Sequence, residues 1–414
     1  MPAVAACVVT VAASGCATVL AWRSPAEVRA PDRAVANALG DGYRGSIPPL
    51  DAASIPLPPE PTNLRPCCVF GADLRIAVGA IPVPGFSLSN IRGPADLGPH
   101  KYNVGLLAIG ASDSGRVFES ENNGIVYTCR GGFLDVAHIR DSADMTVYLE
   151  ARIARIMETG GVIELSDLGG KRRILLNAID RNRIANIGRR SIVNSLAQWL
   201  AFQISVWHEI QSWYGPGTVP GWSEKVSAFS PEDLYSNLLG IKLAGGVSLL
   251  RETTDERRYN EAMDAWIAMA MKRLQAVPRK SAEAAMHAVA GIWWDPTKRL
   301  PDWKLTTRRR MDIGPILKPW VVSMAFAPDP GPYTDCANAG PWLALNNPDD
   351  LGGIPFVGDA TLQIDVSGEL VRNRFPLPRK DSQRITQADF PFVIEGIRRE
   401  NAAVFGEHAD QPAR

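Results

Sequence analysis

The sequence lacks an excess of charge of either sign. Its 414 residues include 44 Lys and Arg and 44 Asp and Glu, so the formal net charge is zero. An overall field that would attract nucleic acid or an anionic membrane surface is therefore absent, and we expect no nucleic-acid partner. The chain also contains no internal repeat and no glycine-rich loop of the phosphate-binding form.

A long apolar segment at the start of the chain is missing as well. The apolar run at residues 4–13 is too short to span a bilayer as a helix. It leads into Ser14-Gly15-Cys16, and this order resembles a bacterial lipoprotein signal, whose cysteine becomes the lipidated first residue after cleavage. Two departures are Ala13 in place of the usual Leu and the lack of Lys or Arg before the run. We expect residues 1–15 to be a lipoprotein signal peptide and Cys16 to anchor the protein to a membrane. An ordinary secretory signal is the alternative.

The cysteines are interpreted in the light of this export. Ala17, rather than Asp, follows the candidate lipidated cysteine, which favours the periplasmic face of the outer membrane. Cysteines in that oxidising compartment are disulfide candidates, and their spacing here matches no compact zinc motif. A bridge between the adjacent Cys67 and Cys68 would be strained. We therefore expect at least one of these two to pair with Cys129 or Cys336.

The chain is long enough for one large domain, which we place at residues 65–405. Residues 16–64 are rich in Ala, Pro, Asp and Arg, and are expected to form an extended tether between the lipid and the domain. Residues 406–414 are expected to be a disordered tail. The predicted fold class is α+β, with a helix-dominated centre and a small, mainly antiparallel sheet built mainly from residues 66–180.

Within the domain, hydrophobic periodicity predicts the individual elements. Residues 190–293 read as helical, and the capping patterns Ser230-Pro231-Glu232-Asp233, Thr254-Asp255-Glu256 and Ser281-Ala282-Glu283 each predict a helix start. Residues 313–380 are expected to form loops and short strands. The predicted strands are residues 74–78, 104–109, 125–128, 162–165 and 173–176, the last two forming a hairpin, and residues 385–405 predict a terminal helix.

One predicted helix carries an unusual polar stripe. It ends Trp207-His208-Glu209-Ile210-Gln211-Ser212-Trp213-Tyr214-Gly215, and large apolar residues run almost around its circumference. A smaller or polar set recurs every three or four residues and forms one face: Gln198, Ala201, Ser205, His208 and Ser212. A carboxylate and an imidazole inside a core are costly unless they are paired, hydrogen-bonded or bound to a metal. This stripe, with Glu209 beside it, is therefore where we expect a site.

A second cluster of histidine and acids lies upstream. Asp135, His138 and Asp141 are spaced by three, with Arg140 between them and Asp144 one turn further. Carboxylate and imidazole at this spacing can bind a divalent metal or hold a histidine in one tautomer. The structural alternative is that the acids cap a helix while His138 and Arg140 satisfy buried carbonyls.

The two clusters together suit a three-ligand site with an open position for water, with zinc as the favoured metal. Its candidate metal ligands are His138, His208, Glu209 and Asp144, and its candidate catalytic groups are Glu209, Asp135 and Arg140. Arg140 would balance acidic charge or bind an anionic substrate group. Because Ser212 stands where a second helical histidine would lie, the chain has no His-Glu-x-x-His motif, and a zinc protease of that type is not expected.

Two nucleophiles are weaker candidates. Ser230 could form a triad with His138 and Asp135, but no nucleophile elbow surrounds it. Cys129 lies near His138 in the sequence, yet a disulfide role fits an exported protein better.

Several motifs together resemble a proteobacterial lipoprotein family known only as domain of unknown function 4056. The resemblance covers roughly residues 60–400, and it implies an envelope lipoprotein without implying an activity. The motifs that carry it are Arg65-Pro66-Cys67-Cys68-Val69-Phe70-Gly71, the Gly-Gly-Phe-Leu-Asp-x-x-His-Ile-Arg segment at 131–140, Trp207-His208-Glu209 through Gly215, and residues 227–237.

The sequence leads to one functional hypothesis and two alternatives. The hypothesis is a metal-dependent hydrolase of the cell envelope that acts on lipid, glycan, peptide or a small molecule. The first alternative is a non-catalytic lipoprotein whose polar stripe is a satisfied hydrogen-bond network. The second is a binding protein with a pocket lined by some of its 11 Trp residues.

Overall fold

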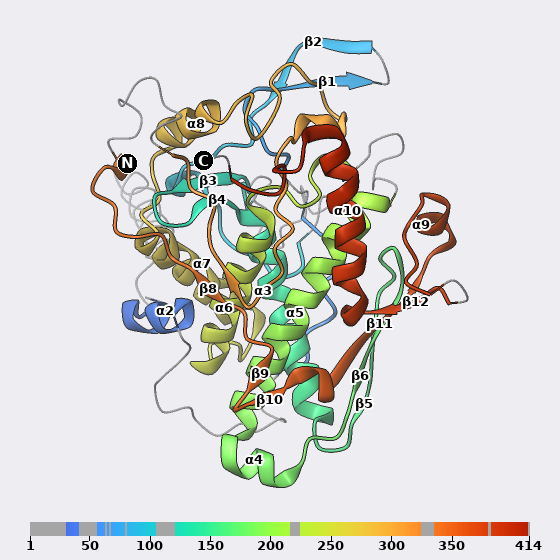
Figure 1. Cartoon of the computed structure of the whole chain (residues 1–414). Coiled ribbons are helices and arrows are strands. Elements are labelled where there is room, and N and C mark those ends of the chain that lie inside the picture. The colour runs from blue at the N-terminus through green and yellow to red at the C-terminus, as the bar shows by residue number, and fades with distance from the viewer. Residues whose placement is uncertain are drawn as a thin grey trace, which may run out of the picture.

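Three long helices form the centre of the protein, as the computed structural model shows (Figure 1). They are α3 (Val136–Ile156), α5 (Arg189–Tyr214) and α6 (Asp233–Leu249), and each packs against the other two. With the antiparallel sheets around them, they confirm the expected α+β class. The structure describes residues 30–40, 56–62, 64–65, 68–78, 81–104, 121–215, 224–323, 335–379 and 382–412.

A four-stranded antiparallel sheet flanks this bundle beside α5 (Figure 1). Its order is β12 (Arg384–Thr386), β11 (Ala360–Val366), β6 (Gly170–Leu176) and β5 (Gly161–Leu165). The expected hairpin is present as β5 and β6. Half of the sheet comes from the C-terminal part of the chain, however, where we expected loops and short strands up to residue 380 and a helix from residue 385, and not a part of this sheet. The reason is that β11 alternates buried apolar and partly exposed residues, a period-2 pattern that loop-forming residues around it obscured.

Two further strand pairs lie at the other end of the bundle. β1 (Leu74–Val78) pairs with β2 (Ile81–Leu88), and β3 (Ile125–Thr128) pairs with β4 (Gly132–Asp135), both antiparallel. β1 and β3 have the predicted bounds, whereas residues 105–109 of the predicted strand at 104–109 lie outside the described residues. β4 runs directly into α3, so this junction fixes where the first turn of α3 begins.

The remaining helices cover the bundle. α7 (Glu256–Arg273) begins after the predicted cap, because the Asp255 carboxylate accepts a hydrogen bond from the Arg258 amide. Its buried residues include Tyr259, Met263 and Trp266. α8 starts two residues before the predicted Ser281, and α10 starts only after β12. The other elements are α2 (Asp32–Leu39), α4 (Arg181–Ile187), α8 (Arg279–Ala288), α9 (Gly368–Arg372), α10 (Phe390–Phe405), β7 (Ile316–Leu317), β8 (Leu345–Asn346), β9 (Asp350–Leu351) and β10 (Ile354–Pro355).

A glycine sets the close approach of α6 to α3. A Cβ atom at Gly240 would lie 2.0 Å from the carbonyl oxygen of Ile139, which no real side chain tolerates. The backbones therefore meet next to His138, the residue before Ile139. This contact fixes how α6 packs against the first turns of α3.

Parts of the expected tether and tail pack against the domain. α2 lies on α6 and α7, with Val35 and Leu39 buried, so residues 30–40 are not an extended tether. Glu60 accepts hydrogen bonds from the amide and hydroxyl of Ser166. In the expected tail, Ala409 is buried and its carbonyl accepts a hydrogen bond from the Arg309 amide. The apolar residues of α2 and Ala409 are too few to change the polar composition of these two segments. Composition therefore did not indicate that they pack against the domain.

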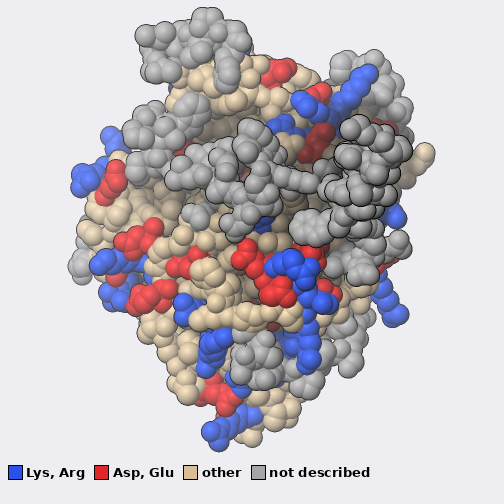
Figure 2. Space-filling view, turned by 180° about the vertical axis from the view of Figure 1, so that it is seen from behind, with Lys and Arg blue, Asp and Glu red and all other residues tan. Residues whose placement is uncertain are grey.

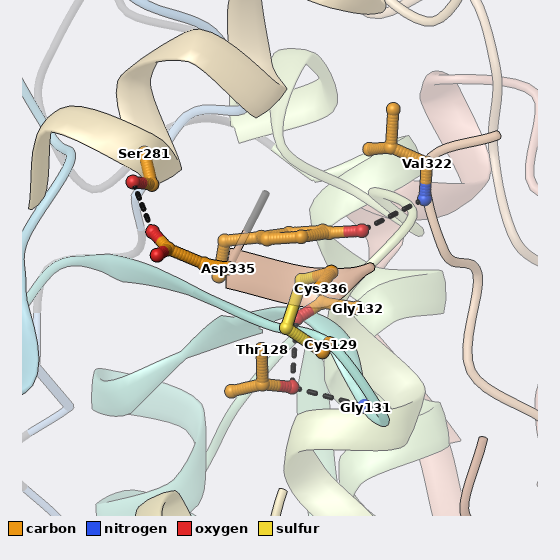
Figure 3. The surroundings of a disulfide bond; sticks show 9 residues. Thr128, Cys129, Gly131, Gly132, Ser281, Val322, Asp335 and Cys336 are labelled. Atoms are coloured by element: carbon orange, nitrogen blue, oxygen red, sulfur yellow. Dashed lines mark hydrogen bonds between the residues drawn. A yellow bond between two sulfur atoms is a disulfide. The ribbon is translucent and has the colours of Figure 1, made fainter. Parts of the chain in front are cut away.

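A disulfide joins Cys129 to Cys336, whose Cα atoms are 5.2 Å apart (Figure 3). It ties the β3–β4 turn to a segment 207 residues later, near the hydrogen bond from the Ser281 hydroxyl to Asp335. This pairing occupies both cysteines that we expected Cys67 or Cys68 to join, so that expectation was wrong. Cys68 is a buried free thiol, and Cys67 lies outside the described residues.

The surface agrees with the balanced composition. On the face shown in Figure 2, basic and acidic side chains lie beside one another rather than in separate patches of one sign. Within the described ranges, no helix combines the length and the apolar character needed to cross a membrane.

The disulfide should contribute measurably to stability, because it closes a long loop in the unfolded chain. We expect the double variant Cys129→Ala, Cys336→Ala to lose about 2–5 kcal/mol of unfolding free energy in chemical denaturation. Added reductant should destabilise the wild type and leave the variant unchanged. Equal stability of both proteins under oxidising conditions would contradict this role.

Candidate metal centre

Asp135 positions His138 by capping α3. Its carboxylate accepts hydrogen bonds from the Ala137 amide at 2.7 Å and from the Cys68 amide at 3.0 Å. Both oxygens are therefore engaged in holding the junction of β4 and α3, which is the usual role of an aspartate at a helix N-terminus. His138 follows in the first turn of α3 and is buried.

Two carboxylates from the other central helices face His138. Its Nε2 atom lies 3.7 Å from Oε1 of Glu209, on α5, and 3.2 Å from Oδ1 of Asp233, the first residue of α6. All three side chains are buried, and the three atoms lie within 4.8 Å of one another. The structure thus joins the two sequence clusters through His138 and Glu209.

These distances suit a shared divalent ion. Ligand atoms about 2.0–2.2 Å from a tetrahedral ion stand roughly 3.3–3.6 Å apart, close to the separations seen here. One imidazole nitrogen and two carboxylate oxygens are ligands that zinc accepts, and three protein ligands would leave one position open. The His138–Glu209–Asp233 group could therefore hold a metal.

The electrostatics of this centre are unbalanced toward negative charge. Four buried carboxylates gather here, from Asp135, Glu209, Glu232 and Asp233, against the buried cations His138 and Arg309. If all were ionised, the excess would be two negative charges, and it becomes three when His138 gives up its proton to bind a metal, so a divalent cation would neutralise most of it. Burying an uncompensated charge is costly, so the centre either takes up protons or binds a cation.

The pKa values of the groups in this centre are shifted by the same burial and excess negative charge. Burial raises the pKa of Glu209 well above its usual range, and the adjacent Asp233 raises it further. Burial likewise raises the pKa of Glu232, with Asp233 and Asp135 adding to it. For His138, burial lowers the pKa, but the facing carboxylates outweigh it and raise the pKa well above the ordinary value. Without a metal, protons must supply the missing positive charge.

The loop before α6 holds the second oxygen of Glu209. Oε2 accepts a hydrogen bond of 2.8 Å from the Phe229 amide, and Phe229 has φ of +55°. A bulky residue in this left-handed region is strained, and such strain persists only where neighbouring contacts enforce it. Arg309 supports the same loop by donating to the Ala228 carbonyl.

A cavity of about 90 Å³ opens beside His138. His208, one residue before Glu209, lines it, with its ring centroid 6.0 Å from that of His138. Burial and the positive charges of His138 and Arg172 lower the pKa of His208 to about 3, so its imidazole is neutral at pH 7. Ser142, Ser205 and Asn237 also line the cavity, and the Ser142 hydroxyl lies 2.6 Å from Oδ1 of Asn237.

Two of the expected site residues lie in a different network. Asp144 is 3.0 Å from Arg65 and 3.1 Å from Nε2 of His100, and it accepts a hydrogen bond from the Tyr259 hydroxyl. Arg140 donates to the Glu121 and Gly98 carbonyls. Neither residue joins the His138 centre, because successive turns of α3 direct Arg140 and Asp144 toward residues 98–103 and Glu121 instead.

Asp233, Glu232 and Arg309 were not identified from the sequence. The adjacent acids after Ser230-Pro231 were interpreted only as favourable charges at a helix N-terminus. A signal was nevertheless present, because two acids open a helix that is apolar on all sides and so must be buried. Arg309 lies between residues 293 and 313, for which no element was predicted.

The alternative nucleophiles are engaged elsewhere. The Ser230 hydroxyl donates to the Ser227 carbonyl at 2.8 Å, and Cys129 is in the disulfide. Burial and the carboxylates of Asp135 and Glu232 raise the pKa of the Cys68 thiol well above its usual range, which disfavours the reactive thiolate.

Two buried carboxylates should respond in opposite ways to amide substitution. Glu209→Gln replaces a carboxyl group whose charged form is disfavoured, so we expect metal-free protein to be as stable as the wild type or more stable. Asp144→Asn breaks the pair with Arg65 and should cost roughly 3–5 kcal/mol of unfolding free energy. Both effects can be measured by denaturant unfolding in the presence of a chelator.

The pH dependence gives a control. Burial raises the pKa of Asp144, but Arg65 and His100 outweigh it and lower the pKa to about 2. A depressed carboxyl pKa adds stability above the unfolded value of about 3.9, and this stability is lost as the pH falls through the folded value. The deficit of Asp144→Asn should therefore shrink between about pH 4 and pH 2. A Glu209→Gln variant that unfolds as readily as Asp144→Asn would instead identify Glu209 as a structural anchor.

Comparison with known proteins identifies the family of this chain but assigns it no activity. No curated protein matches the chain, and no solved structure matches it. The matching family model is described as a protein of unknown function, domain DUF4056, and covers residues 55–323. That range includes the β4–α3 junction, α5 and the start of α6, and so every residue of the candidate metal centre. The chain belongs to the DUF4056 family.

Proposed function

We propose that this protein is a metal-dependent hydrolase of the bacterial cell envelope. The observation that carries the proposal is the buried His138–Glu209–Asp233 group, whose histidine also lines a cavity. A structural core would gain nothing from gathering four carboxylates around one imidazole. A metal centre needs this excess of negative charge.

Zinc is the favoured ion, held by His138, Glu209 and Asp233. When bound, such an ion supplies Lewis acidity toward a carbonyl or phosphoryl oxygen and toward water. His208 is neutral and lines the cavity, so its imidazole can hold and orient a water molecule there through a hydrogen bond. Glu209 thus acts as a ligand in this proposal, and His208 positions the water.

Arg172 takes the anion-binding role that the sequence suggested for Arg140. It lines the same cavity as His208, and the positive charges of Arg172 and His138 both act on His208. Its Nε donates to the Ser166 carbonyl at 2.9 Å, which fixes the guanidinium. An anionic group of the substrate can pair with Arg172 while the bond to be cleaved lies near His138.

The cavity size restricts the substrate. About 90 Å³ holds a few water molecules or one small group. Only the end of a lipid, glycan or peptide could enter, or a small molecule, with Pro61 and Leu64 lining the cavity beside it.

Metal analysis and hydrolysis assays test this function together. We expect the purified protein to bind one zinc ion, and His138→Ala and Asp233→Asn to lose it. His208→Gln should keep the metal but lose about 100-fold in hydrolysis of a panel of chromogenic esters, phosphoesters and amides, because it displaces the group that orients the water. His100→Gln is the matched control and should keep the metal and, where it folds, the activity.

The outcomes separate the alternatives. Zinc binding that survives His138→Ala, or no zinc binding at all, would sink the metal centre and leave a structural polar core. Zinc binding without hydrolysis of any of the three substrate types would leave a metal-binding protein rather than a hydrolase.

The envelope location is a separate part of the proposal. Its support is the apolar run followed by Ser14-Gly15-Cys16, which lies outside the described residues. Cys16→Ser should release the protein from the membrane fraction or block its processing, because it removes the thiol that receives the lipid. Mass spectrometry of the wild type should find an acylated Cys16 as the first residue. A mature start elsewhere without an acyl mass would point to an ordinary secretory signal.

A further inference from the structure

A second and larger cavity lies on the opposite side of α6 from the metal centre. Its volume is about 590 Å³, within the range of small-molecule pockets. Lys242 of α6 lines it, nine residues after Asp233. Nine residues are two and a half helical turns, so the two side chains leave α6 in opposite directions. This cavity is therefore independent of the metal centre and of the function proposed for it.

Lys242 is a half-buried cation that lines the cavity without a counter-ion. Within the part of the chain that the structure describes, its ammonium group has no ion pair and no hydrogen bond. Partial burial lowers its pKa to about 8, and no neighbouring carboxylate raises it. Because no described carboxylate pairs with this ammonium group, an anion that enters the cavity can pair with it.

Amide side chains lie beside this cation. Gln198 and Asn194 of α5 line the cavity, and Nε2 of Gln198 donates to Oδ1 of Asn194 at 2.6 Å. Asn194 in turn donates to the Gly245 carbonyl at 3.0 Å. These bonds orient both amides and leave Oε1 of Gln198 without a hydrogen bond to any described residue. Gln198 is the first residue of the polar stripe of α5, and His208 of the same stripe lines the smaller cavity. Residues of one stripe therefore line both cavities.

The cavity also has an apolar wall and an acidic rim. Trp199 lines it next to Gln198, while Asp349 and Asp350 lie exposed at its edge. The acidic rim disfavours a ligand with several negative charges, whereas a single carboxylate pairs with the single lysine. A sugar ring has apolar C–H faces and polar hydroxyl edges. It therefore matches a cavity that is lined by both an indole ring and oriented amides.

We propose that this cavity binds a carboxylated saccharide, with the carboxylate on Lys242 and ring hydroxyls on the amides of Gln198 and Asn194. In this proposal Lys242 recognises the carboxylate of the ligand and Gln198 recognises its hydroxyls. Each side chain can therefore be substituted without changing the other or the metal centre.

Isothermal titration of the full mature protein with three probes tests the proposal. D-glucuronate has both the carboxylate and the hydroxyls, D-glucose has only the hydroxyls, and acetate has only the carboxylate. We expect glucuronate to bind at least ten times more tightly than either of the others. Lys242→Met should weaken glucuronate at least tenfold, and Gln198→Leu should weaken it too.

The controls keep the result independent of folding and of the metal centre. Lys272→Met, an exposed lysine on α7, should leave glucuronate affinity unchanged. Zinc content and melting temperature of Lys242→Met should match those of the wild type, because Lys242 has no ion pair with a described residue to lose and lies away from the metal centre. Absence of glucuronate binding, equal binding by Lys242→Met, or acetate binding as tightly as glucuronate would each overturn the proposal.

Discussion

The burial of several carboxylates around one imidazole is the constraint on which the centre of this structure depends. Asp135, Glu209 and Asp233 come from the starts or ends of three different helices, and they meet only because those helices pack at one place. The close contact at Gly240 fixes α6 against α3 there. Repulsion among the carboxylates works against this packing, so a bound cation would relieve a cost that the fold otherwise bears.

A second buried network shows what a satisfied arrangement looks like. Arg65 pairs with Asp144 at 3.0 Å, with Asp141 at 2.6 Å and with Glu121 at 2.5 Å. The Arg65 guanidinium lies between these three carboxylates, and it holds residues near the N-terminus of the domain against α3. The two clusters differ in how their carboxylates are satisfied. Arg65 donates directly to all three of its acids, whereas Oε1 of Glu209 and both carboxylate oxygens of Glu232 accept no hydrogen bond from a described residue.

The sequence predicted the elements with strong local patterns. The capping aspartate of α7, the β5–β6 hairpin and the buried helix α5 follow from turn chemistry and periodicity. The partners of His138 were predictable only in part. Glu209 is recognisable because it accompanies a histidine in an apolar helix, whereas Asp233 looks like an ordinary helix-capping acid. Arg172 and Lys242 have no local signal at all, since only tertiary packing shows which cavity each one lines.

Zinc titration with proton counting tests the central claim most directly. In metal-free protein the raised pKa values of His138 and Glu209 favour their protonated forms, so an ion that binds must displace protons. Calorimetry in buffers of different ionisation enthalpy measures this release. The account predicts one zinc ion per chain and a release of protons when it binds. Zinc binding without proton release, or no binding, would show that the carboxylates and His138 do not form a metal centre.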